Sequence, residues 1–287
     1  MIEPAVFYAN PETMETNAYQ VAEHEPRAAV YERALAEFRS FRDKLLAAGV
    51  IITQVRGYDG CPDMVFPNCM STHEEGRLYL YPMLNENRRA EHSEDLIAVL
   101  KKSYEDVHDW RHYAGQGLYL ESTASICRDR VNDVAYIALS PRTSRELAQK
   151  WCDEMDYSPV FFETKSHAGI PVYHTDCVMW IGSTLAGICS PCITDEYRDT
   201  VLESLKKTHA VVEFTMEQLR AFCGNALEVR GSGGKRHLAI SGAGYRALRP
   251  DQLEVIEAHF DGIIQNDLTT LETYGGGSAR CMLMELF

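Results

Sequence analysis

The feature that most constrains the fold is an alternation of short strands with single helices, which runs along the whole chain without a break. Helical spacing of apolar residues predicts helices over residues 27–48, 94–104, 144–155, 194–207, 215–223 and 250–259. Short apolar runs predict strands over residues 50–55, 77–81, 134–139, 160–163, 178–181, 210–214 and 282–286. The pattern recurs about every 50 to 60 residues, which favours a closed radial array of supersecondary units over one open sheet.

Two helices have clear local signals. The helix over residues 27–48 places Val30, Ala34, Phe38, Phe41 and Leu45 at three- and four-residue steps, and Gly49 follows as its C-terminal signal. In the helix over residues 215–223, Thr215 and Gln218 have the spacing of a capping box.

A doubly wound βαβ sheet is the competing fold. That fold requires a glycine-rich turn after its first strand. The strand over residues 50–55 leads instead into Arg56-Gly57-Tyr58-Asp59, which is not such a turn. No Pro/Gly/Ser-rich linker or low-complexity tract divides the sequence, so we expect one catalytic domain over residues 1–287.

Composition excludes several classes of protein. The net charge of −14 opposes binding to nucleic acid or to an anionic lipid surface. No apolar run approaches the roughly 20 residues that a membrane span needs, and Met1-Ile2-Glu3-Pro4 does not resemble a signal peptide. Nine cysteines without framework spacing favour a reducing compartment. We therefore expect a soluble cytoplasmic protein with a small-molecule partner.

A cysteine near the C-terminus is the first candidate for chemistry. Tyr274-Gly275-Gly276-Gly277-Ser278-Ala279-Arg280 ends at Cys281, just before the predicted strand over residues 282–286. Three glycines let the backbone approach a ligand closely. A buried, inert thiol is the alternative, because free cysteine is among the most buried residue types.

A nucleophilic thiol needs a proton-transfer partner and a means of holding its substrate. His174 stands between an apolar run and the strand over residues 178–181, although a histidine there could equally be structural. Glu121 follows an apolar segment and precedes small residues. Burying a carboxylate is costly unless it is paired, and a guanidinium would supply cationic donors. A solvent-facing glutamate at a strand end is the alternative.

Polar residues elsewhere could bind the rest of a substrate. Asp63 and Asn68 lie where we expect a strand to end in a polar loop, although an Asx turn also accounts for Asn68. Arg88, Arg89 and Arg142 could each pair bidentately with a carboxylate, or could be solvated surface arginines.

The order of these motifs resembles the pentein, or guanidine-modifying, superfamily, and within it the citrulline-utilization hydrolase group. The segments that carry the resemblance are Asn17-Ala18-Tyr19-Gln20, Pro62-Asp63-Met64-Val65-Phe66-Pro67-Asn68, Asn87-Arg88-Arg89, Leu120-Glu121, Val172-Tyr173-His174-Thr175 and the closing Gly-Gly-Gly-Ser-Ala-Arg-Cys. The resemblance implies a five-bladed α/β propeller of ββαβ modules around a pseudo-five-fold axis, with the active site on that axis.

The resemblance also assigns roles. Cys281 corresponds to the nucleophile, His174 to the general acid and base, and Glu121 to the carboxylate that holds the substrate nitrogens. The resemblance implies a metal-independent hydrolase of linear C–N bonds with no cofactor. The substrate-binding residues that it implies are Asn17, Asp63, Asn68, Arg88, Arg89 and Arg142.

Two departures from the family pattern bear on substrate choice. Ser122-Thr123-Ala124-Ser125 replaces Gly-Thr-Gly-Ser, and Cys69 stands where an asparagine or an acid is usual. Neutral side chains at residues 68 and 69 favour a neutral ureido group, so the sequence favours citrulline hydrolysis to ornithine, ammonia and carbon dioxide. The alternatives are an arginine dihydrolase, an arginine deiminase-like hydrolase, an amidinotransferase, or an inactive ligand-binding protein. A homo-oligomer is compatible with the sequence.

Overall fold

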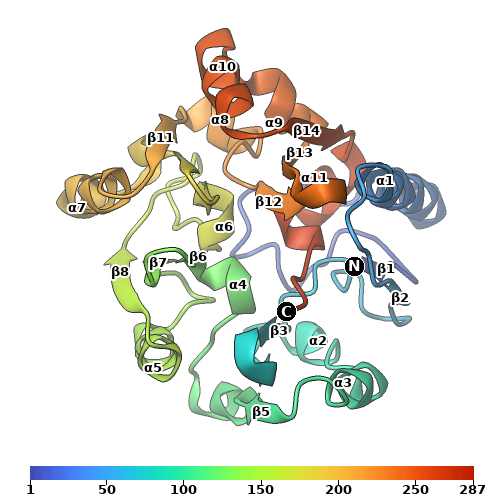
Figure 1. The fold of residues 1–287 in the computed structure, drawn as a ribbon. Coiled ribbons are helices and arrows are strands. Elements are labelled where there is room, and N and C mark those ends of the chain that lie inside the picture. The colour runs from blue at the N-terminus through green and yellow to red at the C-terminus, as the bar shows by residue number, and fades with distance from the viewer.

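Five small units surround a central axis in the computed structural model, which describes residues 1–287 (Figure 1). Each unit contributes one small sheet, and helices lie around the outside of the ring. The radial array that the sequence predicts is therefore confirmed. No helix is long and apolar enough to cross a membrane.

Four units share one topology, in which an antiparallel pair of strands is followed by a helix and a third strand parallel to the second. Their first strands begin at Met70, Cys127, Met179 and Leu227, close to the spacing that the sequence predicts. The elements are β3 (Met70–His73), β4 (Arg77–Leu80), α3 (Glu94–Leu100) and β5 (Asp106–Asp109); β6 (Cys127–Asp129), β7 (Val134–Ala138), α5 (Arg145–Met155) and β8 (Ser158–Phe162); β9 (Met179–Ile181), β10 (Leu185–Ile188), α7 (Asp195–Lys206) and β11 (Ala210–Glu213); and β12 (Leu227–Arg230), β13 (Arg236–Ser241), α10 (Pro250–His259) and β14 (Gly262–Asn266).

The fifth unit has a smaller sheet, in which β1 (Ile2–Glu3) pairs in parallel with β2 (Val55–Arg56). Helix α1 (Arg27–Ala47) connects them and buries the five apolar side chains that the sequence places on its inner face. Gly49 follows at φ 84°, the left-handed conformation expected of a C-terminal glycine. Helix α8 (Met216–Arg220) begins with the predicted capping box of Thr215 and Gln218.

Two predicted strands are wrong. Of residues 50–55, only Val55 belongs to a strand, because the N-terminal strand that pairs with this segment is two residues long. Residues 282–286 form no strand, because a 3-10 turn at Arg280–Met282 redirects the chain. The last residues are held by single contacts, such as the Thr72 hydroxyl donating to the Glu285 carbonyl at 2.8 Å, instead of by a ladder.

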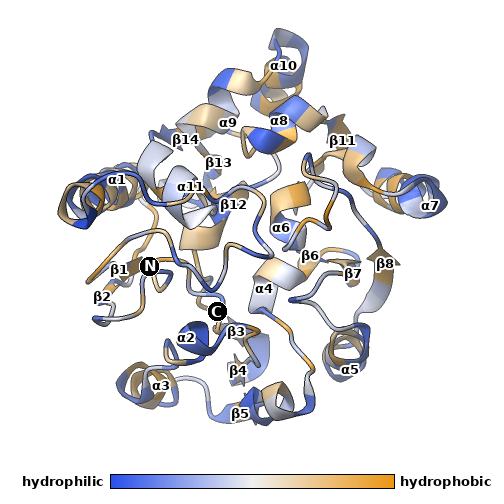
Figure 2. Ribbon diagram, turned by 180° about the vertical axis from the view of Figure 1, so that it is seen from behind, coloured by the Kyte–Doolittle hydropathy of each residue, from blue (hydrophilic) through white to orange (hydrophobic).

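The apolar core consists of several clusters of buried side chains. The largest apolar cluster joins β7, β9, β10 and β13 with helix α7. In Figure 2 the outer helices α1 and α7 carry both apolar and polar colours, as expected of helices with one buried side. The shorter helices are α2 (Glu86–Arg89), α4 (Ser122–Ser125), α6 (Thr175–Val178), α9 (Gly242–Ala247) and α11 (Thr269–Gly275). In Figure 1, α4 and α6 lie near the axis, whereas α9 lies farther out, beside α8.

Candidate active site

A small cavity lies beside the short helices α2, α6 and α11. Seven of the nine residues singled out in the sequence line it, although they are far apart in the chain. A larger apolar hollow elsewhere, around Ile51 and Phe287, contains none of the nine. The lining residues are Thr13, Asn17, Asp63, Phe66, Asn68, Arg88, Arg142, Tyr173, His174, Gly275, Gly277 and Cys281.

His174 and Glu121 form a buried pair behind this cavity. Each immediately precedes a short helix, α6 for His174 and α4 for Glu121. His174 Nε2 lies 2.7 Å from Glu121 Oε2, so the ring carries its proton on Nε2 when it is neutral. His174 Nδ1 has no protein partner and can exchange a proton with a bound molecule.

The two partners have opposite protonation tendencies. Burial lowers the pKa of His174, so the neutral ring is favoured. Burial alone would raise the pKa of Glu121, but the Arg142 charge and the His174 hydrogen bond lower it to about 2. The Leu84 N–H also donates to Glu121 Oε1 at 3.2 Å. Glu121 is therefore an ionised carboxylate within the protein.

Cys281 lies in the 3-10 turn and is held by Asn225. The Asn225 Nδ2 donates to Cys281 Sγ at 3.1 Å, and Asn225 Oδ1 accepts from the Arg280 and Cys281 N–H groups at 3.0 and 3.4 Å. Hydrogen bonding from Cys177 lowers the pKa of Cys281 most, and together with Asn225 it overcomes burial to bring that pKa to about 6. The thiolate, which is the nucleophilic form, is thus stabilised in the free protein.

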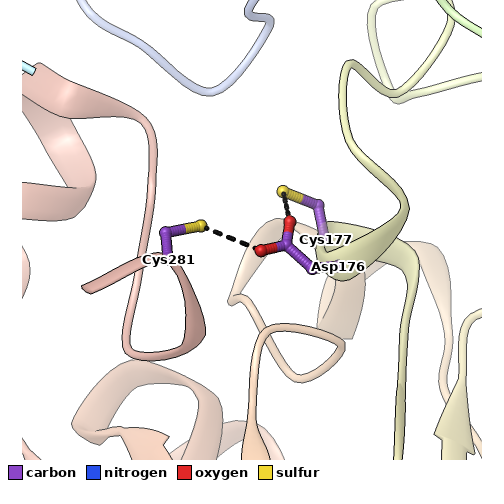
Figure 3. Close-up of side chains that lie close together, drawn as sticks. All are labelled: Asp176, Cys177 and Cys281. Atoms are coloured by element: carbon purple, nitrogen blue, oxygen red, sulfur yellow. Dashed lines mark hydrogen bonds between the residues drawn. The ribbon is translucent and has the colours of Figure 1, made fainter. Parts of the chain in front are cut away.

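Asp176 and Cys177 lie beside Cys281, as Figure 3 shows. One carboxylate contacts both thiols, because Asp176 Oδ2 is 3.5 Å from Cys281 Sγ and Oδ1 is 3.6 Å from Cys177 Sγ. Burial raises the pKa of Asp176, and the neighbouring Cys281 thiolate raises it further. One oxygen of Asp176 and the two sulfurs all lie within 4.8 Å of one another, so these residues could hold a metal ion.

Sequence reasoning missed Asp176, Cys177 and Asn225. Asp176 could have been found from the sequence, because it stands only two residues after the candidate His174. Asn225 could not, because it reaches Cys281 only through the folding of a different unit.

The glycines before Cys281 are required by close packing. A Cβ on Gly276, whose φ is 63°, would lie 2.4 Å from Asn17 Nδ2, and a Cβ on Gly275 would lie 2.6 Å from the Phe66 ring. Asn17 donates to the Gly275 and Gly276 carbonyls at 3.3 and 3.4 Å. The glycine run lets a buried loop reach Cys281.

Arg142 has a partly free guanidinium at the cavity. Its Nε and Nη2 donate to the Thr16 hydroxyl at 3.0 and 2.8 Å, and Nη2 also donates to the Thr13 carbonyl at 3.1 Å. Nη1 lies 3.7 Å from Glu121 Oε2, and the group stacks 4.8 Å from the Tyr173 ring centre. Arg142 therefore joins the segment over residues 13–17 to the His174–Glu121 pair.

Asp63 presents one unpaired oxygen. Its Oδ2 accepts from Asn10 at 2.7 Å and from Thr13 at 3.3 Å, whereas the buried Oδ1 has no partner. Burial raises the pKa of Asp63. Asn68, from the same segment, lines the cavity with its neutral amide.

Arg88 is buried and Arg89 is half-buried, and their contacts differ. Arg88 lines the cavity, but its donors bind Glu91 at 2.8 and 2.9 Å and the Phe66 carbonyl at 2.7 Å. Arg89 lies outside the cavity and donates to the Met83 and Leu84 carbonyls at 2.9 and 2.8 Å.

The structure shows the surroundings of the two departures from the family pattern, the segment over residues 122–125 and Cys69. Ser122 adopts φ 57°, a conformation that favours glycine, and its hydroxyl donates to the Met70 carbonyl at 3.0 Å. Cys69 does not line the cavity. Its thiol faces the Glu91 carbonyl at 3.8 Å and packs in an apolar cluster with Met70 and Leu78.

Comparisons with known proteins agree with this architecture. A sequence model of the N,N dimethylarginine dimethylhydrolase family, eukaryotic, matches residues 3–287. A search of curated protein sequences found no match.

Solved structures provide the fold likeness. One similar structure is the N-terminal domain of ArgZ bound to substrate, where ArgZ is an arginine dihydrolase from the ornithine-ammonia cycle in cyanobacteria. Its TM-score is 0.78 and its sequence identity is 16%, over 98% of this chain and 95% of that chain. A dimethylarginine dimethylaminohydrolase adduct with S-methyl-L-thiocitrulline has a TM-score of 0.67 and 16% identity over 99% of this chain and 98% of that chain. AgrE in complex with L-arginine has a TM-score of 0.78 and 13% identity over 98% of this chain, but this chain spans only 39% of AgrE. At these identities the likeness establishes a shared fold.

Proposed function

Because the chain belongs to the eukaryotic N,N-dimethylarginine dimethylhydrolase family of the pentein superfamily, we propose that it hydrolyses the guanidinium group of arginine or of an N-methylated arginine. The observation that carries this proposal is the pair of buried carboxylates, Glu121 and Asp176, which lie beside His174 and Cys281 respectively. Burying a carboxylate is costly unless it is paired, and a cationic ligand supplies charge-assisted hydrogen bonds to it.

Asp176 supports a cation most directly. Burial and the Cys281 thiolate both disfavour its charge in the empty site. A guanidinium bound next to it would restore the carboxylate and would stabilise the thiolate at the same time. Asp63, whose Oδ1 has no partner, supplies a third acceptor for N–H groups.

The chemistry uses groups already at the cavity. The Cys281 thiolate attacks the planar guanidinium carbon and forms a tetrahedral adduct. His174 reacts as the imidazolium: its Nδ1 takes up a proton from the Cys281 thiol or from solvent and delivers it to the departing nitrogen. That nitrogen leaves as ammonia or as dimethylamine, and a covalent S-alkylthiouronium intermediate remains. His174 then removes a proton from water, the resulting hydroxide attacks the same carbon, and the carbon–sulfur bond breaks to release citrulline.

Arg142 is the best candidate to bind the substrate α-carboxylate, because part of its guanidinium is free of strong partners at the cavity. Asn17 and Asn68 complete the polar lining. Arg88 is committed to Glu91 and to backbone carbonyls, so we assign it to shaping the loop that carries Asp63. Arg89 supports the backbone at Leu84, whose N–H binds Glu121.

Citrulline hydrolysis is the second candidate. The neutral amide of Asn68 favours it, since a ureido oxygen accepts a hydrogen bond where a guanidinium cannot. Cys69 does not favour citrulline, because its thiol does not line the cavity and faces the Glu91 carbonyl. A cytoplasmic location and a single catalytic domain over residues 1–287 remain part of the proposal.

The test is a product assay on separate incubations with arginine, asymmetric dimethylarginine and citrulline. A guanidinium hydrolase releases citrulline together with ammonia or dimethylamine from the first two substrates. Ornithine and ammonia from citrulline alone would favour the second candidate. The Cys281→Ala variant is the matched control, and activity that survives in it would contradict the proposal.

A further inference from the structure

A second thiol, that of Cys177, lies near Cys281 and takes no part in the proposed hydrolysis. Cys177 belongs to α6 and Cys281 to the 3-10 turn near the C-terminus, yet both side chains point at the same carboxylate (Figure 3). The metal-binding atoms of Cys177, Asp176 and Cys281 lie within 4.8 Å of one another. Both cysteines are buried and neither forms a disulfide in this structure.

We propose that Cys177 is a resolving thiol, so that oxidation of Cys281 by a hydroperoxide ends in a Cys177–Cys281 disulfide that reversibly disables the nucleophile. The inference rests on the proposed role of Cys281 as the reactive thiolate. Three observations carry it: the short distance between the sulfurs, the shared carboxylate, and the opening of Cys281 onto the substrate cavity.

The first step oxidises Cys281. Its thiolate attacks one oxygen of hydrogen peroxide and the O–O bond breaks, giving a sulfenic acid on Cys281 and, after proton transfer, water. Peroxide is small enough to enter by the path that substrate and the hydrolytic water must use. Cys177 does not compete for this step, because burial raises its pKa and keeps it as a thiol.

The second step forms the disulfide. Oxidation to a neutral sulfenic acid removes the Cys281 thiolate charge that opposes ionisation of Asp176. Asp176 Oδ1, 3.6 Å from Cys177 Sγ, is then placed to remove the Cys177 proton as its sulfur attacks the sulfenic sulfur. The S–O bond breaks, and hydroxide leaves with that proton as water. The two sulfurs together lose two electrons and one peroxide becomes two waters, so the reaction balances with the hydroperoxide as the only added reagent.

Other thiols are less suited to this role. Cys127 directs its sulfur to the Met179 carbonyl at 3.4 Å. Cys189 and Cys192 form a separate close pair, in which the Cys192 thiol donates to the Cys189 carbonyl at 3.0 Å. That pair could also oxidise, so the experiment must locate the disulfide and cannot rely on the mass of the whole protein.

To test this, the wild-type protein is treated with a small excess of hydrogen peroxide. The remaining thiols are then blocked, and the peptides are mapped by mass spectrometry. We expect a cross-linked species that joins the Cys177 and Cys281 peptides, about 2 Da lighter than the sum of the reduced peptides, and its loss after dithiothreitol. The Cys192→Ser variant is the matched control, and it should form the same cross-link.

The Cys177→Ser variant decides the proposal. Without a resolving thiol, Cys281 should proceed to species about 32 or 48 Da heavier, which dithiothreitol does not reverse. Absence of the cross-link in wild type, or full recovery of reduced Cys281 in Cys177→Ser, would overturn the inference. Because the readout is a mass and not turnover, a protein that forms the cross-link without hydrolysing any guanidinium would reject the proposed function alone.

Discussion

The side-chain amide of Asn225 donates to the sulfur of Cys281 at 3.1 Å while its oxygen accepts from the Cys281 and Arg280 N–H groups. One residue thus fixes the turn that presents the thiol and also stabilises the thiolate. A hydrogen bond to a charged group contributes about 1.5–3 kcal/mol.

The Asn225→Asp variant should therefore raise the pKa of Cys281 from about 6 and slow the reaction about 10- to 100-fold at neutral pH. The new carboxylate cannot donate to the sulfur, and its charge opposes the thiolate. The measurement is the pH dependence of Cys281 alkylation by iodoacetamide, with Cys281→Ala to correct for other thiols. An unchanged midpoint would show that Asn225 acts only on the backbone.

The Cys281→Ala and His174→Ala variants should each abolish turnover and keep the fold. Both side chains line the cavity, and neither belongs to a strand ladder. Circular dichroism and thermal unfolding check the fold, and the product assay checks activity. Near-normal activity in either variant would reject the assigned roles.

Glu121 should contribute to stability in acid. Its pKa is about 2 in the folded protein against an ordinary value of 4.5, so the stabilisation is present above pH 4.5 and is lost as the pH falls toward 2. At neutral pH it amounts to roughly 3 kcal/mol. Urea unfolding from pH 6 to pH 2.5 should show a steeper loss of unfolding free energy in wild type than in Glu121→Gln. If the unfolding free energies of the two proteins fall in parallel with pH, Glu121 does not contribute this stabilisation.

Two variants separate the candidate substrates. Asp176→Asn should reduce kcat/KM for arginine more than for citrulline, because the lost charge matters most against a cation. Cys69→Asp should instead lower Tm without moving the ratio of the two specificities, since it buries a carboxylate that faces the Glu91 carbonyl. A shift of the ratio toward arginine in Cys69→Asp would mean that residue 69 reaches the substrate after all.

The sequence by itself determined the repeated architecture and the outer helices. Helix α1 could be predicted because its spacing of Val30, Ala34, Phe38, Phe41 and Leu45 is a local property that burial of one face then satisfies. The same holds for the capping box at Thr215. The local run around each of Cys281, His174 and Glu121 was a weak signal, and these residues could be singled out only because the order of six motifs along the chain resembles the pentein superfamily.

Only the tertiary structure decided which of the candidates meet and what surrounds them. Asp176, Cys177 and Asn225 reach Cys281 from more than 50 positions earlier in the chain, and no local pattern specifies that contact. The segments over residues 50–55 and 282–286 have strand-like composition, but a strand forms only where a partner backbone is available to complete its hydrogen bonds. Arg89 and Cys69 face away from the cavity for the same reason: the direction of a side chain depends on packing among units that are distant in sequence.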